Sequence, residues 1–261
     1  MGEKEAENAG EFSDEELERY FQEAENEEKY IPFWQSAAVK RILAGIISVM
    51  LVANVLAFLP KVFSMPAVQF LSTSARLFQS ETIQGYSKAV VVVSAGNRKG
   101  TGFQISGEQG IIVTNKHVVG DESVSTITFA NGERRIGKVI VRDPDVDIAL
   151  LSVGPNEHPV LEPADPELET TGKPVVVIGN PLFFNWIANE GKVLSLLEDR
   201  NPPMLALQAP IYRGNSGSPV IGEDGRVIGV VFATSTVEVE EKEAKVGLAV
   251  PIRWVIKHLE Q

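Results

Sequence analysis

The sequence predicts an all-β body at residues 85–261, preceded by one transmembrane helix. From residue 86 onward, about twelve short runs rich in β-branched residues alternate with turn signals such as the Asn-Gly pair at 131–132. Only residues 252–259 of this body have a helical pattern. Before the body, the 18 residues 42–59 carry no charge.

The composition is that of a folded protein with an acidic surplus. The chain has 261 residues, of which 44% are hydrophobic and 23% are charged, so general disorder is excluded. It has no cysteine, which excludes a disulfide scaffold, a cysteine-based metal site and a thiol nucleophile. The net charge of −11 argues against nucleic-acid binding.

The acidic surplus is concentrated at the N-terminus, which we expect to form a tail over residues 1–35. Residues 1–30 hold 12 acidic and 3 basic side chains. Ser13 and Glu16 have the spacing of a capping box at the start of a helix. A solvated acidic tail with partial helix is the simpler interpretation, and a docking helix for a cytoplasmic partner is the alternative.

Residues 36–60 are expected to cross a membrane, with their apolar core at 42–59. A helix of that core's length reaches about 27 Å, close to the roughly 30 Å of a bilayer's hydrocarbon interior. A buried core helix is disfavoured because the segment has no polar stripe. The adjacent Lys40 and Arg41 favour a cytoplasmic N-terminus, with the body outside the cell membrane.

The remaining chain divides into a linker at 61–84 and a domain at 85–261. Long crossover helices are missing from the pattern, so an antiparallel sandwich or barrel is favoured over a doubly wound α/β fold. The domain is long enough to bury two cores. The expected strands are 89–94, 101–106, 111–115, 125–130, 138–143, 148–153, 174–179, 192–197, 204–209, 219–222, 226–233 and 246–251.

His117 is the catalytic candidate among the three histidines. It lies in the run V-T-N-K-H-V-V, at the end of an expected strand. A single histidine at a strand end is more often structural, but His117 alone has partner motifs elsewhere in the chain. His158, in a polar loop, and His258, on the expected C-terminal helix, are expected to take no part in the chemistry.

Asp147 directly precedes an apolar run, where an aspartate is well placed to be buried and to orient a histidine. The run D-P-D-V-D also suggests a calcium loop, but Ile148 stands where an EF-hand has glycine, and Gly154 where it has glutamate. We therefore expect no metal, and we expect Asp143 and Asp145 to be turn acids.

Ser216 is the nucleophile candidate. In R-G-N-S-G-S-P-V it lies between glycines whose turn can expose backbone N–H groups to a developing oxyanion. The hydrolase elbow G-x-S-x-G fails because Ser218 stands where its second glycine belongs. His117, Asp147 and Ser216 occur in the chymotrypsin order, and three motifs in that order predict a Ser-His-Asp triad.

The body resembles the trypsin-like serine proteases, and within them the HtrA/DegP branch. The resemblance implies two perpendicular six-stranded β-barrels with the triad in the cleft between them and no cofactor. It also allows a homo-oligomer, a trimer as in many relatives. The segments that carry it are T-G-F-Q-I-S (101–106), I-V-T-N-K-H-V-V (112–119), D-V-D-I-A-L-L (145–151), V-I-G-N-P (177–181), R-G-N-S-G-S-P-V (213–220) and G-L-A-V-P-I (247–252).

The chain also departs from that branch. It ends at Gln261, directly after the expected closing helix, so we expect no PDZ domain. Ser218 follows the G-N-S-G core, where the branch usually has glycine. Asn215 replaces the aspartate that pairs with a newly cut N-terminus in zymogen-activated relatives, so we expect no such activation.

The resemblance also assigns the oxyanion hole and the primary pocket. Relatives that cleave after Lys or Arg have an aspartate where this chain has Pro210. Relatives that cleave after Glu commonly have a histidine on the pocket strand, and this chain has none near 230–234. We therefore expect cleavage after small or medium apolar residues. Arg213 would recruit acidic residues instead if it folded over the pocket rim. The oxyanion donors are the N–H groups of Gly214 and Ser216, and the pocket residues are Pro210, Ile211, Phe232, Ala233 and Thr234.

The predicted function is that of a membrane-anchored serine endopeptidase, which acts through an acyl-enzyme on unfolded or exported proteins. The alternative is a protease-like module that binds at the membrane without cleaving. Labelling of Ser216 by a fluorophosphonate distinguishes the two.

Overall fold

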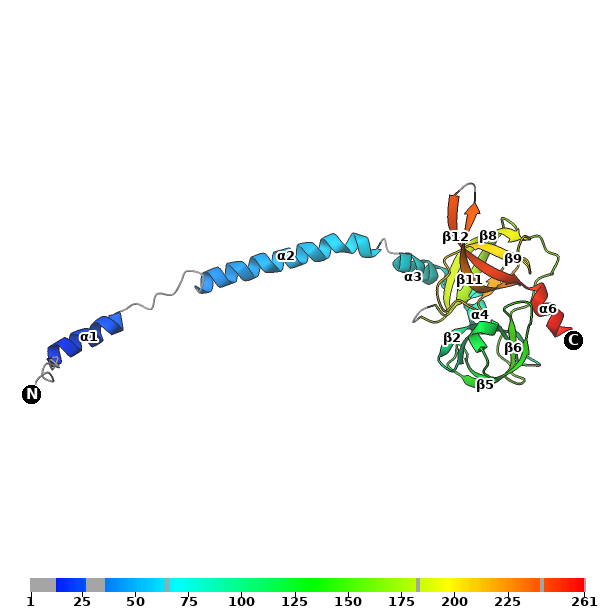
Figure 1. Cartoon of the computed structure of the whole chain (residues 1–261), viewed down its shortest axis with the longest axis horizontal. Helices are drawn as coiled ribbons and strands as arrows, with labels where there is room; N and C mark the ends of the chain where they lie inside the picture. Colours follow the sequence, from blue (N-terminus) through cyan, green and yellow to red (C-terminus); the bar gives the residue numbers. More distant parts are fainter. Residues whose placement is uncertain (1–12, 27–35, 64–65, 182–183, 240–241, 261) are drawn as a thin grey trace, which may run out of the picture. The chain divides into compact units, whose positions relative to one another are not determined.

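The computed structural model of the chain describes residues 13–26, 36–63, 66–181, 184–239 and 242–260. The chain divides into two compact units, residues 1–63 and 64–261. The first unit holds helices α1 and α2, and the second holds the strands (Figure 1).

The first unit confirms the capping box. α1 (Asp14–Asn26) begins after Ser13, whose Oγ accepts the Glu16 N–H at 3.3 Å, while the Ser13 N–H donates to Glu16 Oε2 at 3.1 Å. α2 (Ala37–Phe63) includes Ala37–Ala57, which by length and composition can cross a membrane and has none of its apolar window buried. Apolar side chains with no protein partner are stable in a bilayer, so α2 fits the membrane span, which stays a prediction.

Two helices precede the first strand, in a range where the sequence pattern indicated none. α3 is Pro66–Leu77 and α4 is Glu81–Ala89. α3 is fastened to the body, because the Ser74 hydroxyl accepts the Ala188 N–H at 3.1 Å and the buried Phe70 ring lies 4.7 Å from the Tyr212 ring. Pro66 lies in the first turn of α3, a position at which proline is well tolerated.

The body consists of two closed six-stranded antiparallel barrels, as predicted. The first runs in the order β1-β2-β3-β6-β5-β4 and the second in the order β10-β11-β12-β9-β8-β7. Closure leaves each barrel without free edges along most of its length. The strands are β1 (Val90–Ala95), β2 (Arg98–Ser106), β3 (Ile111–Thr114), β4 (Val124–Thr128), β5 (Arg134–Arg142), β6 (Ala149–Ser152), β7 (Pro174–Gly179), β8 (Ile187–Leu197), β9 (Met204–Gln208), β10 (Pro219–Ile221), β11 (Val227–Val239) and β12 (Lys242–Pro251).

Three of the four apolar clusters in the described part of the chain hold this arrangement together. One fills the first barrel around Ile127 and Phe129, and another fills the second barrel around Leu207. The third combines residues of both barrels, such as Phe103 from β2 and Ile178 from β7, both fully buried. Each large side chain of this kind stabilises the fold by roughly 1.5–3 kcal/mol, so the third core fixes one barrel against the other.

The hairpin of β11 and β12 is longer than the sequence analysis expected. β11 runs to Val239, which pairs with Lys242, and Figure 1 shows the hairpin projecting from the second barrel. The predicted strand ended at 233 because the apolar run ends there. The outer half of the hairpin has exposed polar residues such as Thr234 and Thr236 instead. The chain closes with α6 (Arg253–Leu259), where the sequence predicted a helix.

Candidate active site

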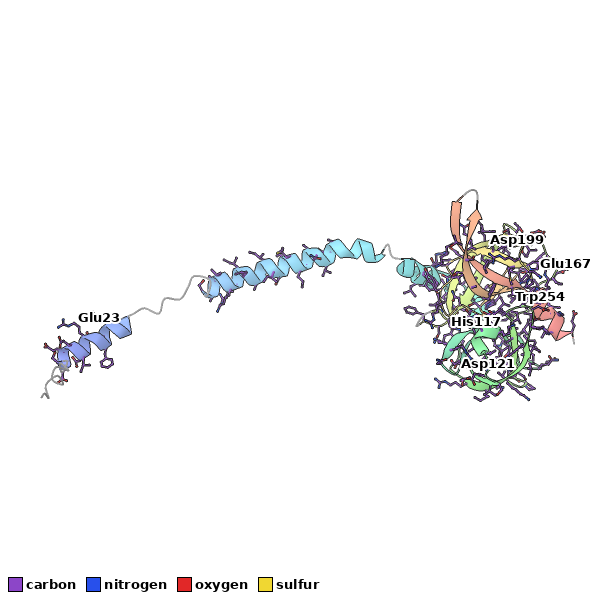
Figure 2. All side chains as sticks on the ribbon, viewed as in Figure 1. Glu23, His117, Asp121, Glu167, Asp199 and Trp254 are labelled. Carbon is purple, nitrogen blue, oxygen red and sulfur yellow. The ribbon has the colours of Figure 1, made fainter. Side chains whose placement is uncertain are left out.

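His117 lies on a short helix rather than at a strand end, which corrects the expectation from the sequence. β3 ends at Thr114, and the buried Asn115 in an extended conformation starts α5 (Lys116–Val119). Gly120 ends the helix with a φ of 55°, a left-handed value that suits glycine. A four-residue helix is too short to give a periodic pattern, which is why the sequence did not reveal it. Figure 2 labels His117 where the strands of the two barrels meet in that view.

His117 and Asp147 are joined by two hydrogen bonds. The Nδ1 atom of His117 lies 2.5 Å from Asp147 Oδ2, and the backbone N–H of His117 donates to Oδ1 at 2.9 Å. Asn115 holds the other side of this pair, because its amide nitrogen donates to the Asp147 carbonyl at 2.7 Å. A carboxylate acceptor favours the proton on Nδ1, which leaves Nε2 free to accept a proton from another group.

A second aspartate of the same loop has its own histidine, which the sequence analysis missed. Asp143 is 1% exposed, and its Oδ2 atom lies 2.6 Å from Nε2 of His258 on α6. Its Oδ1 atom accepts the N–H groups of Asp145 and Val146 at 2.8 and 2.9 Å. Burial raises the pKa of Asp143, but the hydrogen bonds to Val146, His258 and Asp145 outweigh burial and hold this pKa below its ordinary value.

The turn around Ser216 depends on two glycines. Gly214 and Gly217 have φ values of 102° and 87°, which L side chains rarely adopt. A Cβ atom on Gly214 would collide with the carbonyl oxygen of Asn180, and one on Gly217 with that of Thr101. The chain therefore folds closely on itself here, and only glycine permits that approach.

The atoms of this turn are left available for chemistry. The Ser216 hydroxyl makes a long contact of 3.5 Å to the carbonyl of Phe232, and within the described ranges it has no hydrogen bond to His117. Among the described residues, the N–H groups of Gly214 and Ser216 have no protein acceptor either. Catalytic hydrogen bonds are often long without a substrate, so this geometry leaves the hydroxyl and both donors accessible to a ligand.

A buried network that the sequence analysis did not predict supports the turn. The Thr101 hydroxyl donates to the Gly214 carbonyl at 2.7 Å and accepts the Asn180 N–H at 2.9 Å. The Asn180 side chain donates to the Val91 carbonyl and accepts the Trp186 N–H, at 2.9 and 3.0 Å. Thr101 and Asn180 belong to the T-G-F and G-N-P segments that carried the family resemblance, but the spacing of these segments does not show that the two residues are in contact.

One cleft of about 500 Å³ is lined by three of the candidate residues. His117, Gly214 and Ser216 line it, together with Asn97, Arg98, Lys99, Val118, Asn180 and Arg213. Asp147 is not part of the lining and reaches the cleft through its bond to His117. The structure thus brings His117, Asp147 and Ser216 to one place.

The five residues expected to line the primary pocket lie outside that cleft lining. Pro210 and Thr234 are exposed, and Ile211 is nearly buried against Gly247. Phe232 and Ala233 are partly buried and pack against an apolar cluster formed by Ala206, Val246 and Leu248. In the described part of the chain, no three His, Asp or Glu side chains are grouped to hold a metal ion.

The comparisons with known proteins start from curated relatives. A protein described as "Serine protease HtrA-like" from Staphylococcus aureus strain USA300 is 32% identical over 176 residues. That alignment covers 60% of this chain and 22% of the relative, so this chain spans only a minor part of the relative's length.

Solved structures and a family model extend the comparison. The serine endoprotease from Yersinia pestis is 26% identical with a TM-score of 0.59, covering 69% of this chain and 64% of that one. The inactive form of the Rv3671c protease is 28% identical with a TM-score of 0.59, covering 70% of this chain and 93% of that one. Residues 100–230 match the model of the trypsin-like peptidase domain. Because this match covers half of the sequence, the chain belongs to the trypsin-like peptidase domain family.

Proposed function

We propose that this protein is a serine endopeptidase. The observation that carries the proposal is the 2.5 Å contact between His117 Nδ1 and Asp147 Oδ2 in a cleft that also contains the Ser216 hydroxyl. Membership of the trypsin-like peptidase family supports it. The relatives and structural neighbours named above are described as proteases, which points to the same chemistry.

In the proposed mechanism the Ser216 hydroxyl attacks the scissile carbonyl. His117 Nε2 takes the proton and later delivers it to the leaving amine, while Asp147 keeps the imidazole in the required tautomer and stabilises its charged form. The N–H groups of Gly214 and Ser216 donate to the oxyanion, and the loss of such a donor typically lowers the rate about 10²–10³-fold. In the second step His117 takes a proton from a water molecule, which attacks the acyl-enzyme, and His117 then returns the proton to the Ser216 oxygen as the acid product leaves.

We propose cleavage after small or medium apolar residues, in unfolded or exported proteins. Pro210 and Ala233 offer no charge to a bound side chain, and the partly buried Phe232 and Ala233 belong to an apolar cluster. A charged side chain bound there would lose its hydration without gaining a charged or polar partner, which costs binding free energy. An apolar side chain gains free energy from burial instead.

We also propose that α2 anchors the protein in the cell membrane with the body outside. The length of Ala37–Ala57 and the uncharged run 42–59 support the anchor, and Lys40 and Arg41 support the orientation. A homotrimer remains an expectation of the family resemblance.

A fluorophosphonate probe on the full chain in detergent tests the proposal. Wild-type protein is expected to be labelled and to cleave casein, and Ser216→Ala is expected to lose both while keeping its thermal unfolding profile. Ser218→Ala, a buried serine two residues away, is the matched control and should still be labelled. A folded wild-type protein that is neither labelled nor active would favour the alternative, a protease-like module that binds without cleaving.

A further inference from the structure

The candidate cleft is lined by positive charge in a protein that is otherwise acidic. Arg98, Lys99 and Arg213 line it beside His117 and Ser216, and no aspartate or glutamate is among the lining residues. The chain as a whole has a net charge of −11. The cleft is therefore locally positive in a protein of negative net charge. A locally positive cleft attracts negatively charged ligands.

The charges of these side chains are not neutralised within the described residues. Lys99 Nζ donates to the side-chain oxygen of Asn185 at 2.9 Å, and an Arg98 nitrogen lies 3.5 Å from the Val119 carbonyl. Both acceptors are uncharged, so they position the cations without compensating them. Arg213 is exposed, and none of the ion pairs described in this structure includes it or the other two cations.

The position of the cleft relative to Ser216 indicates which part of a substrate meets these charges. The Ser216 hydroxyl lies 3.5 Å from the Phe232 carbonyl, on the strand expected to form the primary pocket. That strand and Pro210 are not part of the cleft lining, whereas His117, which would protonate the leaving amine, is. The cleft therefore fits the leaving half of the substrate, on the C-terminal side of the scissile bond.

We infer that Arg98, Lys99 and Arg213 select substrates with acidic side chains just C-terminal to the scissile bond. The inference rests on the proposed endopeptidase function and adds a substrate class to it. Exposed charge pairs are weak, so we expect a preference of about fivefold rather than an absolute requirement. Salt screens exposed charges, so the preference should fall below about twofold at 0.5 M salt.

The test uses two quenched fluorescent peptides with valine at the cleavage position. They are identical except that the two residues after the scissile bond are both Glu or both Lys. Full-length wild-type protein in detergent at low salt is expected to cleave the Glu peptide with a kcat/KM about fivefold higher. In the double variant Lys99→Gln/Arg213→Gln this ratio should fall to near one, while fluorophosphonate labelling of Ser216 persists.

A matched double variant, Lys138→Gln/Lys192→Gln, removes the same charge from exposed strand positions outside the cleft and should keep the wild-type ratio. Charge reversal by Arg213→Glu should favour the Lys peptide relative to wild type. Equal cleavage of both peptides by the wild type, or a preference unaffected by salt, would overturn the inference and leave the endopeptidase intact. A folded wild type that cleaves neither peptide and takes up no probe would overturn the proposed function and this inference with it.

Discussion

At the residue scale, two aspartates of one loop each pair with a histidine from a different helix, and the two pairs have different surroundings. The Asp147 pair is partly open, with the His117 side chain 50% exposed, whereas the Asp143 pair is nearly closed, with His258 13% exposed. A proton-transfer group needs access to substrate, while a hydrogen bond closed off from solvent can join two elements of the fold. The exposure of the two pairs thus supports the proposed catalytic role of Asp147, and we expect a structural role for Asp143.

Asp147→Asn is expected to lower kcat by about 10⁴-fold, because the amide stabilises the wrong tautomer of His117. Peptide hydrolysis by the full chain in detergent measures the effect. Asp145→Asn is the control, since Asp145 is exposed and contributes only a backbone N–H to this loop, and it should keep its activity. If Asp145→Asn were the inactive variant, the assignment of the histidine's partner would be wrong.

Asp143→Asn is expected to lower the free energy of unfolding at pH 7 by about 1.5–3 kcal/mol, because the hydrogen bonds of Asp143 are charge-assisted. The lowered pKa of Asp143 means that its ionised form stabilises the folded state above the ordinary carboxyl pKa, and that this contribution is lost as the pH falls through the folded value. The difference in free energy of unfolding between Asp143→Asn and wild type should therefore become smaller at acid pH. Urea unfolding at pH 7 and at pH 3 measures it, and a gap that is unchanged at pH 3 would contradict the role of the charge.

At the element scale, the turn that carries Ser216 is supported by both barrels. Thr101 lies on β2 of the first barrel, and Asn180 follows β7 of the second. The Thr101 hydroxyl accepts the Asn180 N–H and donates to the carbonyl of Gly214, the residue that carries one of the proposed oxyanion donors. The geometry of the turn thus depends on how the barrels pack.

Thr101→Val keeps the shape of this side chain and removes its hydroxyl, so it is expected to lower kcat about tenfold with little change in KM, since a misplaced oxyanion donor weakens transition-state stabilisation. Thr101→Ser restores the hydroxyl and should recover most of the rate. Steady-state kinetics on one peptide separates the two constants. A loss confined to KM, or no rescue by serine, would assign Thr101 to packing alone.

At the scale of the whole molecule, charge is distributed unevenly along the chain. The N-terminal residues 1–30 are strongly acidic, α2 is apolar, and the body has a cationic cleft. These parts suit different surroundings: an aqueous tail, a bilayer and an exposed catalytic surface. The distribution leads to a prediction of topology.

Protease added to intact cells or spheroplasts is expected to digest the body and to spare the tail, because the two cations at 40–41 favour a cytoplasmic N-terminus. Epitope tags at each end of the full chain report which part survives. Neutralising the pair with Lys40→Gln/Arg41→Gln should weaken this orientation. Protection of the body with digestion of the tail would reverse the assignment.

The sequence by itself determined the strand pattern, the apolar helix and the order of His117, Asp147 and Ser216. Each of these is a local property, because a β-branched run between turn signals, an uncharged run and a glycine-flanked serine are each visible within a short stretch of sequence. The expectation of two six-stranded barrels came from the family resemblance, and the strand order of the two closed barrels agrees with it. The helix α6 was likewise evident from its spacing of apolar residues.

Only the tertiary structure decided which distant residues share the site. The Thr101–Asn180 network, the Asp143–His258 pair and the cationic cleft join residues far apart in the chain. Their separation gives no local pattern, since the contacts exist only after the barrels close and pack on each other. The four-residue helix α5 escaped detection for a related reason: its stability comes from packing rather than from its own periodicity.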